Sequence, residues 1–129
     1  MAAIETECCV VGGGPAGMMA GYLFARAGVK TVVLEKHGDF LRDFRGDTVH
    51  PSTLEIMHEL GLAEAYLKRP HQKAERLGGN FGEKHLRIAD FTGIKAHYPF
   101  IALMPQWDFL DFLADAAKKL PSFSLSMNT

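Results

Sequence analysis

The sequence lacks the features that mark membrane-spanning and secreted proteins. No apolar run approaches the roughly 18–20 residues that a helix needs to cross a bilayer. The N-terminus has no positively charged segment followed by an apolar stretch, so we expect no secretory signal. The only two cysteines, Cys8 and Cys9, are adjacent in a predicted strand and should point to opposite faces. We predict that both are buried apolar side chains and not a disulfide or metal pair, and we expect a cytoplasmic protein.

An excess of charge of either sign is also missing. The chain has 14 lysines and arginines, 15 aspartates and glutamates, and a net charge of −1, with the two signs interspersed. This pattern argues against a nucleic-acid or membrane partner. None of the six histidines has the spacing typical of a metal site, so we expect no metal and assign them surface or capping roles: His37, His50, His58, His71, His85 and His97. No arrangement of Ser, His and Asp indicates nucleophilic catalysis, and we nominate no catalytic residue.

Glycine, in contrast, is concentrated near the N-terminus. A short run at 8–11 suits a buried parallel strand, and it is followed directly by Gly12, Gly13, Gly14, Pro15, Ala16 and Gly17. Gly12, Gly14 and Gly17 have the spacing G-x-G-x-x-G. The first glycine permits a tight turn, the second lets the backbone approach a pyrophosphate, and the third lets the helix lie close to the strand. Pro15 suits the first turn of that helix.

The segment after the glycine turn completes a strand–helix–strand pattern. The helix should run to about Ala27 and end at Gly28, and a second apolar strand should lead to Glu35, 18 residues after Gly17. A carboxylate there can accept hydrogen bonds from the ribose hydroxyls of adenosine, and it would repel a 2′-phosphate. The pyrophosphate would lie at the helix N-terminus. We therefore predict a dinucleotide site. The alternative is that the glycines only permit close packing.

The middle of the chain combines two helices with a β-rich segment. Ser52 and Glu55 have the spacing of a capping box, beside Pro51, and predict a helix that ends at Gly61. A short further helix is expected over 63–69. From residue 75, turn signals flank alternating apolar and polar residues, so we predict a β-hairpin or meander on a layer different from the parallel sheet.

The end of the chain should return to helix and strand. A helix with a buried apolar stripe follows Gln106, Trp107 and Asp108 and stops at Pro121, and a strand begins at about 123. We find no repeats, low-complexity segments or linkers. The sequence thus predicts a single α/β domain over 1–129, with a β-rich insertion at 75–104.

Four segments together resemble one protein family. They are the glycine turn at 12–17, the strand end at 32–36, the segment 45–53 before a helix, and Pro105-Gln106-Trp107 before another helix. The chain is similar over its whole length to the N-terminal part of class A FAD-dependent aromatic monooxygenases, related to para-hydroxybenzoate hydroxylase. The resemblance implies a Rossmann-like FAD-binding fold and FAD as the cofactor.

The resemblance also implies roles for individual residues. Gly12 to Gly17 would hold the FAD pyrophosphate, Glu35 the adenosine ribose, and Lys36 would lie beside the adenosine. Arg45 would reach the pyrophosphate and the flavin side, although a solvated arginine is an alternative and Arg42 could take its place. Gln106 would contact the ribityl region. In such enzymes NAD(P)H reduces the flavin, and O₂ is then used to hydroxylate a small aromatic substrate.

The chain departs from the family in length, because members are about three times as long and carry a later Gly-Asp motif. We therefore expect a truncated, incomplete FAD-binding domain that binds FAD weakly or not at all, hydroxylates nothing alone, and forms a homo-oligomer because apolar surfaces lack partners. One rival interpretation is the nucleotide-binding domain of an NAD-linked dehydrogenase or reductase. Another is a non-catalytic truncated domain that self-associates.

Overall fold

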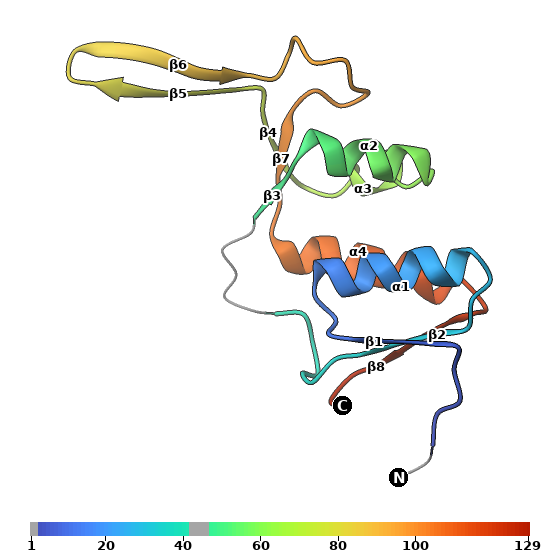
Figure 1. Ribbon diagram of the computed structural model, residues 1–129. Helices are drawn as coiled ribbons and strands as arrows, with labels where there is room; N and C mark the ends of the chain where they lie inside the picture. The colour runs from blue at the N-terminus through green and yellow to red at the C-terminus, as the bar shows by residue number, and fades with distance from the viewer. Residues whose placement is uncertain (1–2, 42–46) are drawn as a thin grey trace. The chain divides into compact units, whose positions relative to one another are not determined.

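The computed structural model describes residues 3–41 and 47–129 and divides into two compact units (Figure 1). The first unit comprises Met1–Phe44 and Gln106–Thr129, and the second comprises Arg45–Pro105. Among the described residues, no helix is both long and apolar enough to cross a membrane.

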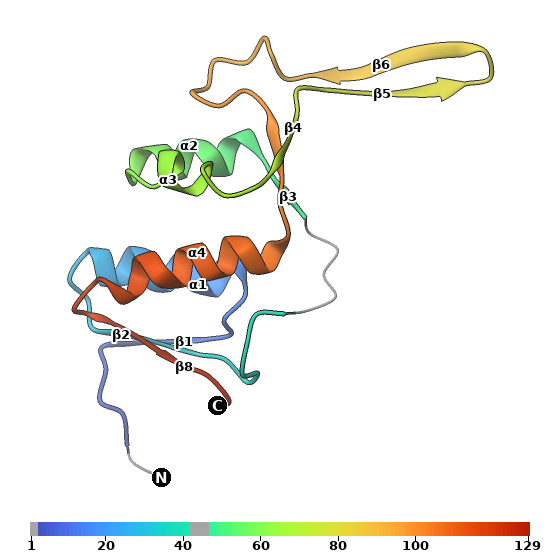
Figure 2. The ribbon, with the colours of Figure 1, turned by 180° about the vertical axis from the view of Figure 1, so that it is seen from behind.

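The first unit is a parallel three-stranded sheet with two helices. Its strands are β1 (Cys8–Val11), β2 (Thr31–Leu34) and β8 (Phe123–Ser126), in the order β1-β2-β8. Helix α1 (Pro15–Arg26) connects β1 to β2, and α4 (Gln106–Lys118) precedes β8. Figures 1 and 2 show α1 and α4 side by side on one face of this sheet. The strand–helix–strand unit expected from the glycine turn is confirmed, and the mixed α/β class with it.

Close packing of α1 against the sheet depends on small residues. A Cβ at Gly21 would collide with the side chain of Val33, which is fully buried. Helix α4 contributes Leu110, Leu113 and Ala117 to the same core, with exposed fractions of 1% or less. The apolar stripe predicted for this helix therefore forms the interface with α1 and the sheet.

The prediction that both cysteines are buried is wrong, because the face of the sheet opposite the helices is open. Cys8 is half-buried and Cys9 is exposed, so they are not two buried apolar side chains. The cause is that β1 is an edge strand and Cys9 points away from the helices, as does Val11, which is 83% exposed. Alternation of side chains along the strand was predicted, but the lack of a second covering layer could not be.

The second unit is built from short antiparallel strands and two short helices. It contains β3 (Thr48–Val49), α2 (Pro51–Glu59), α3 (Ala63–Tyr66), β4 (Gln72–Ala74), β5 (Arg76–Phe81), β6 (Lys84–Asp90) and β7 (Ile101–Leu103). Strands β3, β7 and β4 form one sheet in that order, and β5 pairs with β6 in a separate hairpin. Leu54, Met57, Ala63 and Tyr66 form much of its core.

The predicted capping box at the start of α2 is wrong. The helix begins at Pro51 with His50 as N-cap and has no side-chain cap hydrogen bond. Proline is favoured at the first helical position because its missing N–H needs no partner there. Ser52 therefore lies inside the helix, and Glu55 makes a contact elsewhere in the second unit.

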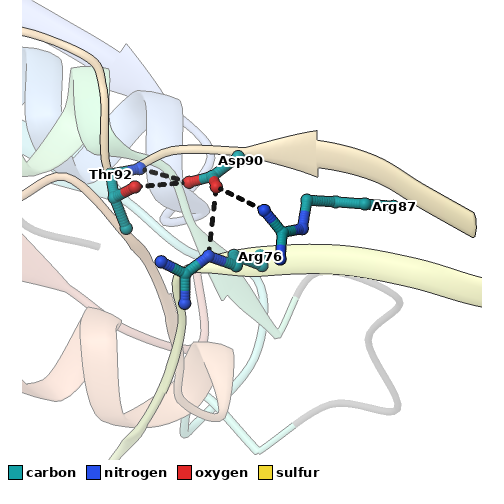
Figure 3. A network of polar contacts seen from close by, with 4 residues as sticks. All are labelled: Arg76, Arg87, Asp90 and Thr92. Atoms are coloured by element: carbon teal, nitrogen blue, oxygen red, sulfur yellow. Dashed lines mark hydrogen bonds and ion pairs between the residues drawn. The ribbon is translucent and has the colours of Figure 1, made fainter.

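The β5–β6 hairpin confirms the prediction of an antiparallel ribbon separate from the parallel sheet. Gly82 turns the chain with a φ of 63°, and apolar side chains such as Phe81 and Ile88 are exposed along it. At its base the Asp90 carboxylate accepts hydrogen bonds from Thr92 and pairs with Arg76 at 3.0 Å (Figure 3). The hydroxyl and amide of Thr92, followed by Arg76, lower the pKa of Asp90 to about 2.

Candidate functional site

The turn between β1 and α1 requires glycine at two positions for different reasons. Gly12 has a backbone φ of 114°, a value that residues with a side chain rarely adopt. Its N–H donates to the carbonyl of Leu34 at 2.7 Å. A Cβ at Gly17 would collide with the carbonyl oxygen of Gly12. The turn therefore brings the first turn of α1 directly against the end of β1.

The helix end that follows this turn is open. Gly14 is the N-cap and has no side chain to bond the helix, and a Cβ there would meet nothing within 4 Å. Pro15 has no N–H, and the amides of Ala16 and Gly17 have no partner within the helix because they belong to its first turn. Free amides and the positive end of the helix dipole together favour an anion at this point.

Glu35 follows β2 directly, and its carboxylate lies against the glycine turn. Its Oε2 accepts a hydrogen bond from the N–H of Gly13 at 2.8 Å. Its Oε1 accepts from the N–H of His37 at 3.0 Å and lies 2.7 Å from Nδ1 of the same residue. A Cβ at Gly13 would lie only 2.9 Å from Glu35, so glycine at this position makes room for the carboxylate.

These hydrogen bonds keep Glu35 ionised. The backbone N–H of His37 is the main cause that lowers the pKa of Glu35 to about 2, with further contributions from the His37 ring and the Gly13 N–H. Partial burial, with the side chain 13% exposed, opposes this effect without reversing it. The group is therefore a hydrogen-bond acceptor at all physiological pH values.

A cavity of about 240 Å³ joins the turn to this carboxylate. Gly13, Gly14 and Glu35 line its polar side, and Lys36 adds a cation. Apolar lining comes from Phe40 and from Leu110 of α4. The donor set fits a nucleoside diphosphate: free amides for phosphate, a carboxylate for sugar hydroxyls, and an apolar wall for a base.

Residues after β8 hold the loop that carries Glu35. The N–H of Thr129 donates to the carbonyl of Glu35 at 2.9 Å, and the N–H of Asn128 donates to that of His37 at 3.0 Å. The backbone of 35–37 is thus anchored by a segment distant in sequence.

The structure brings four of the site residues predicted from the sequence around one cavity: Gly13, Gly14, Glu35 and Lys36. The other predicted residues of the glycine turn lie beside it in sequence but do not line the cavity. Gln106 does not line this cavity; it is the half-buried first residue of α4. Arg45 and its alternative Arg42 lie outside the described residues. His37 was missed, and its position two residues after Glu35 was the only signal that could have found it.

A second polar cluster lies in the second unit. The Nδ1 of His97 is 2.9 Å from Oε1 of Glu55, and the N–H of His97 donates to Oε2 of the same carboxylate at 3.1 Å. The rings of His58 and His97 are stacked with centroids 3.7 Å apart. Within the described ranges, however, no group of three His, Cys, Asp or Glu side chains is placed to hold a metal ion.

Comparison with known proteins identifies the family of the chain. Residues 5–129 match the family described as FAD binding domain. A protein of Bacillus subtilis named as an uncharacterized aromatic compound monooxygenase, YhjG, is 32% identical over 91% of this chain and 23% of its own length. The 6-methylpretetramide 4-monooxygenase of Streptomyces rimosus is 26% identical over 97% of this chain and 30% of its own.

A solved structure of a monooxygenase is also similar to this chain. The p-nitrophenol 4-monooxygenase PnpA of Pseudomonas putida superposes with a TM-score of 0.82 and 27% identity, over 99% of this chain and 33% of that protein. The chain therefore spans about a quarter to a third of the length of these relatives. Because the family match extends over nearly the whole sequence, the chain belongs to the family of FAD-binding domains found in flavin-dependent aromatic monooxygenases.

Proposed function

We propose that the first unit binds the ADP half of FAD in a Rossmann-like manner. The glycine turn would let the pyrophosphate approach the backbone, and the amides of the first turn of α1 would hold it. Glu35 would accept hydrogen bonds from the adenosine ribose, and Lys36 would lie beside the adenosine. The single observation that carries this proposal is the ionised Glu35 carboxylate held 2.8 Å from the Gly13 N–H, at the edge of an open helix N-terminus.

Glu35 also bears on the choice among dinucleotides. A carboxylate at this point accepts a hydrogen bond from a ribose hydroxyl and repels a 2′-phosphate. The site therefore suits FAD or NAD and disfavours NADP. The family match decides for FAD between the first two.

Two further residues of the site rest on the family resemblance. Arg45 would reach the pyrophosphate and the flavin side of the cofactor. Gln106, at the first turn of α4, would contact the ribityl chain. We also keep the prediction of one FAD-binding domain over 1–129 with a β-rich insertion at 75–104.

For the whole protein, we propose hydroxylation of an aromatic compound with NAD(P)H and O₂. Several relatives are named for such reactions on phenols or tetracycline precursors. FAD supplies the redox chemistry when bound, and the protein's residues supply binding, orientation and electrostatics. Because this chain spans a third or less of those relatives, we expect it to hydroxylate nothing alone and to bind FAD weakly.

Titration of the isotopically labelled chain with FAD, followed by NMR, tests the proposal. We expect the largest shifts at the glycine turn, the first turn of α1 and residues 35–40, further shifts at Arg45 and Gln106, and a dissociation constant of about 10–1,000 μM. Gly17→Ala should abolish them because its Cβ meets the carbonyl of Gly12, whereas the control Gly93→Ala, where a Cβ meets nothing within 4 Å, should bind normally. An NAD titration that gives the larger shifts, or no shift with FAD, would contradict the proposal.

Self-association is a second candidate property. Val11 is 83% exposed in β1, and Ile88 and Phe81 of the hairpin are 69% and 59% exposed. Association between copies of the chain buries exposed apolar residues on sheet faces and edges. We propose a homo-oligomer, and a monomeric sedimentation profile at high protein concentration would contradict it. A cytoplasmic location stays a prediction.

A further inference from the structure

We propose that His37 is a positioning residue for Glu35, and that its ring sets the affinity of the site for the adenosine ribose. The inference rests on the proposed function, in which Glu35 accepts hydrogen bonds from that ribose. His37 itself would not contact the ligand's reacting atoms. It would act by holding the carboxylate in the orientation that the ribose requires.

The hydrogen bonds around the carboxylate carry this inference. An ionised carboxylate has about four acceptor positions on two oxygens. The Gly13 N–H occupies one on Oε2, while the N–H and the ring of His37 occupy two on Oε1. The remaining acceptor position lies on Oε2, the oxygen next to the glycine turn. A ribose hydroxyl beside a bound pyrophosphate would therefore find an acceptor that is already oriented.

Of the two contacts from His37, only the ring contact depends on the side chain. The backbone of 35–37 is anchored separately, because Thr129 and Asn128 donate to the carbonyls of Glu35 and His37. The His37 side chain is 44% exposed, so little packing is lost when it is removed. Replacing the ring thus tests the ring contact with small effects on the loop or the fold.

The ring contact needs a hydrogen on one particular ring atom. The Nδ1 must carry it in order to donate to Glu35. Because the acceptor is an ionised carboxylate, this hydrogen bond is charge-assisted. The other charged groups that line the cavity are Lys36 and Asp39. Both are retained when the ring is replaced, so a change in ribose binding reports the ring contact.

The decisive experiment compares two ligands on three forms of the full chain. ADP and 2′,3′-dideoxy-ADP, which lacks both ribose hydroxyls, are titrated by NMR into the wild type, His37→Ala and His37→Asn. The asparagine amide nitrogen lies near the position of Nδ1 and can donate to the same oxygen. We expect His37→Ala to weaken ADP binding roughly 3- to 10-fold and leave dideoxy-ADP unchanged, and His37→Asn to restore most of the loss.

The difference between the two ligands supplies a readout that a merely structural role would not change. Damage to the fold or the loop would weaken ADP and dideoxy-ADP alike, whereas loss of the ring contact weakens only the ligand that carries ribose hydroxyls. His85→Ala is the matched control, because the ring nitrogen of His85 lies 2.8 Å from Oδ1 of Asn80 in the β5–β6 hairpin. It should bind both ligands as the wild type does.

The outcomes separate this inference from the proposed function. If the wild type binds ADP more tightly than dideoxy-ADP but His37→Ala behaves like the wild type, the inference is wrong and the proposed function stands. Equal losses for both ligands in His37→Ala would also overturn it, because they indicate a structural role. If the wild type binds neither ligand, or both equally, the proposed role of Glu35 fails and the inference fails with it.

Discussion

The two units organise their polar groups in different ways. In the first unit the polar site is made mainly by the backbone: glycines expose amides, and Glu35 accepts from the N–H groups of Gly13 and His37. In the second unit polar contacts join side chains across the surface, such as Glu55 with His97, which is 42 residues away. Backbone donors are set by local conformation, whereas side-chain pairs depend on tertiary packing. The first kind of site is therefore stiffer and easier to predict from sequence.

The largest expected effect tests whether the units are also separate in stability. Leu113 of the first unit and Leu54 of the second are both fully buried. Truncating either leucine to alanine should cost about 2–5 kcal/mol, because it removes buried apolar surface and leaves a cavity. We expect Leu113→Ala to abolish FAD binding, and Leu54→Ala to leave it within about 2-fold at low temperature. Thermal unfolding and FAD titration of both variants provide the measurement.

Volume-conserving variants provide the controls for this comparison. Leu113→Met and Leu54→Met should each cost less than about 1.5 kcal/mol and keep FAD binding. If Leu54→Ala loses FAD as completely as Leu113→Ala, the two units do not fold independently and the comparison fails.

The same contrast explains how much could be predicted from the sequence. Gly12, Gly14 and Gly17 predict the turn because positive φ, open space and close approach are local properties of the backbone. The strand end at Glu35 follows from the same strand–helix–strand pattern. In contrast, the sequence suggested that Glu55 caps α2 beside Ser52, and the structure pairs it with His97. Nothing within a few residues of Glu55 identifies that partner.

His37 lies between these two cases. Its N–H bonds Glu35 through a local turn of two residues, but its carbonyl is held by the N–H of Asn128, which is distant in sequence. A histidine in a polar loop is by itself typical of a solvated side chain. The exposure of Cys9 was missed for a related reason, because an alternating pattern does not reveal whether the second face of a sheet is covered.

A smaller effect concerns the acid stability of the two units. The folded-state pKa of Glu35 is about 2, below its ordinary value of 4.5. Its ionised contacts therefore stabilise the fold fully above about pH 4.5, and this contribution is lost as pH falls from there toward 2. Glu35→Gln should be less stable than the wild type at pH 6, and the difference should shrink by pH 3. Urea unfolding at both pH values measures it.

Asp90 offers the matched comparison in the second unit. Its pKa is also lowered to about 2, from 3.8, mainly by the hydroxyl and amide of Thr92. Asp90→Asn should show the same sign of pH dependence but leave FAD titrations unchanged, because Asp90 anchors the β5–β6 hairpin. Equal weakening of FAD binding by Asp90→Asn and Glu35→Gln would show that the site is not confined to the first unit.

The smallest expected effect is on the exposed pair of Glu55 and His97, whose side chains are 35% and 55% exposed. The hydrogen bonds from the amide and then the ring of His97 lower the pKa of Glu55, so the contact is present above the ordinary value of 4.5 and is lost as pH falls through the lowered one. Exposed pairs contribute little to global stability because solvent screens them. We therefore expect Glu55→Gln to shift Tm by about 2 °C or less. The exchange of the His97 amide hydrogen should nevertheless become faster, since that N–H loses its charged acceptor.

A matched Glu59→Gln variant, at the exposed end of α2, should leave the exchange unchanged. A large drop in Tm with Glu55→Gln would show instead that the second unit depends on a side-chain pair as strongly as the first depends on its glycine turn.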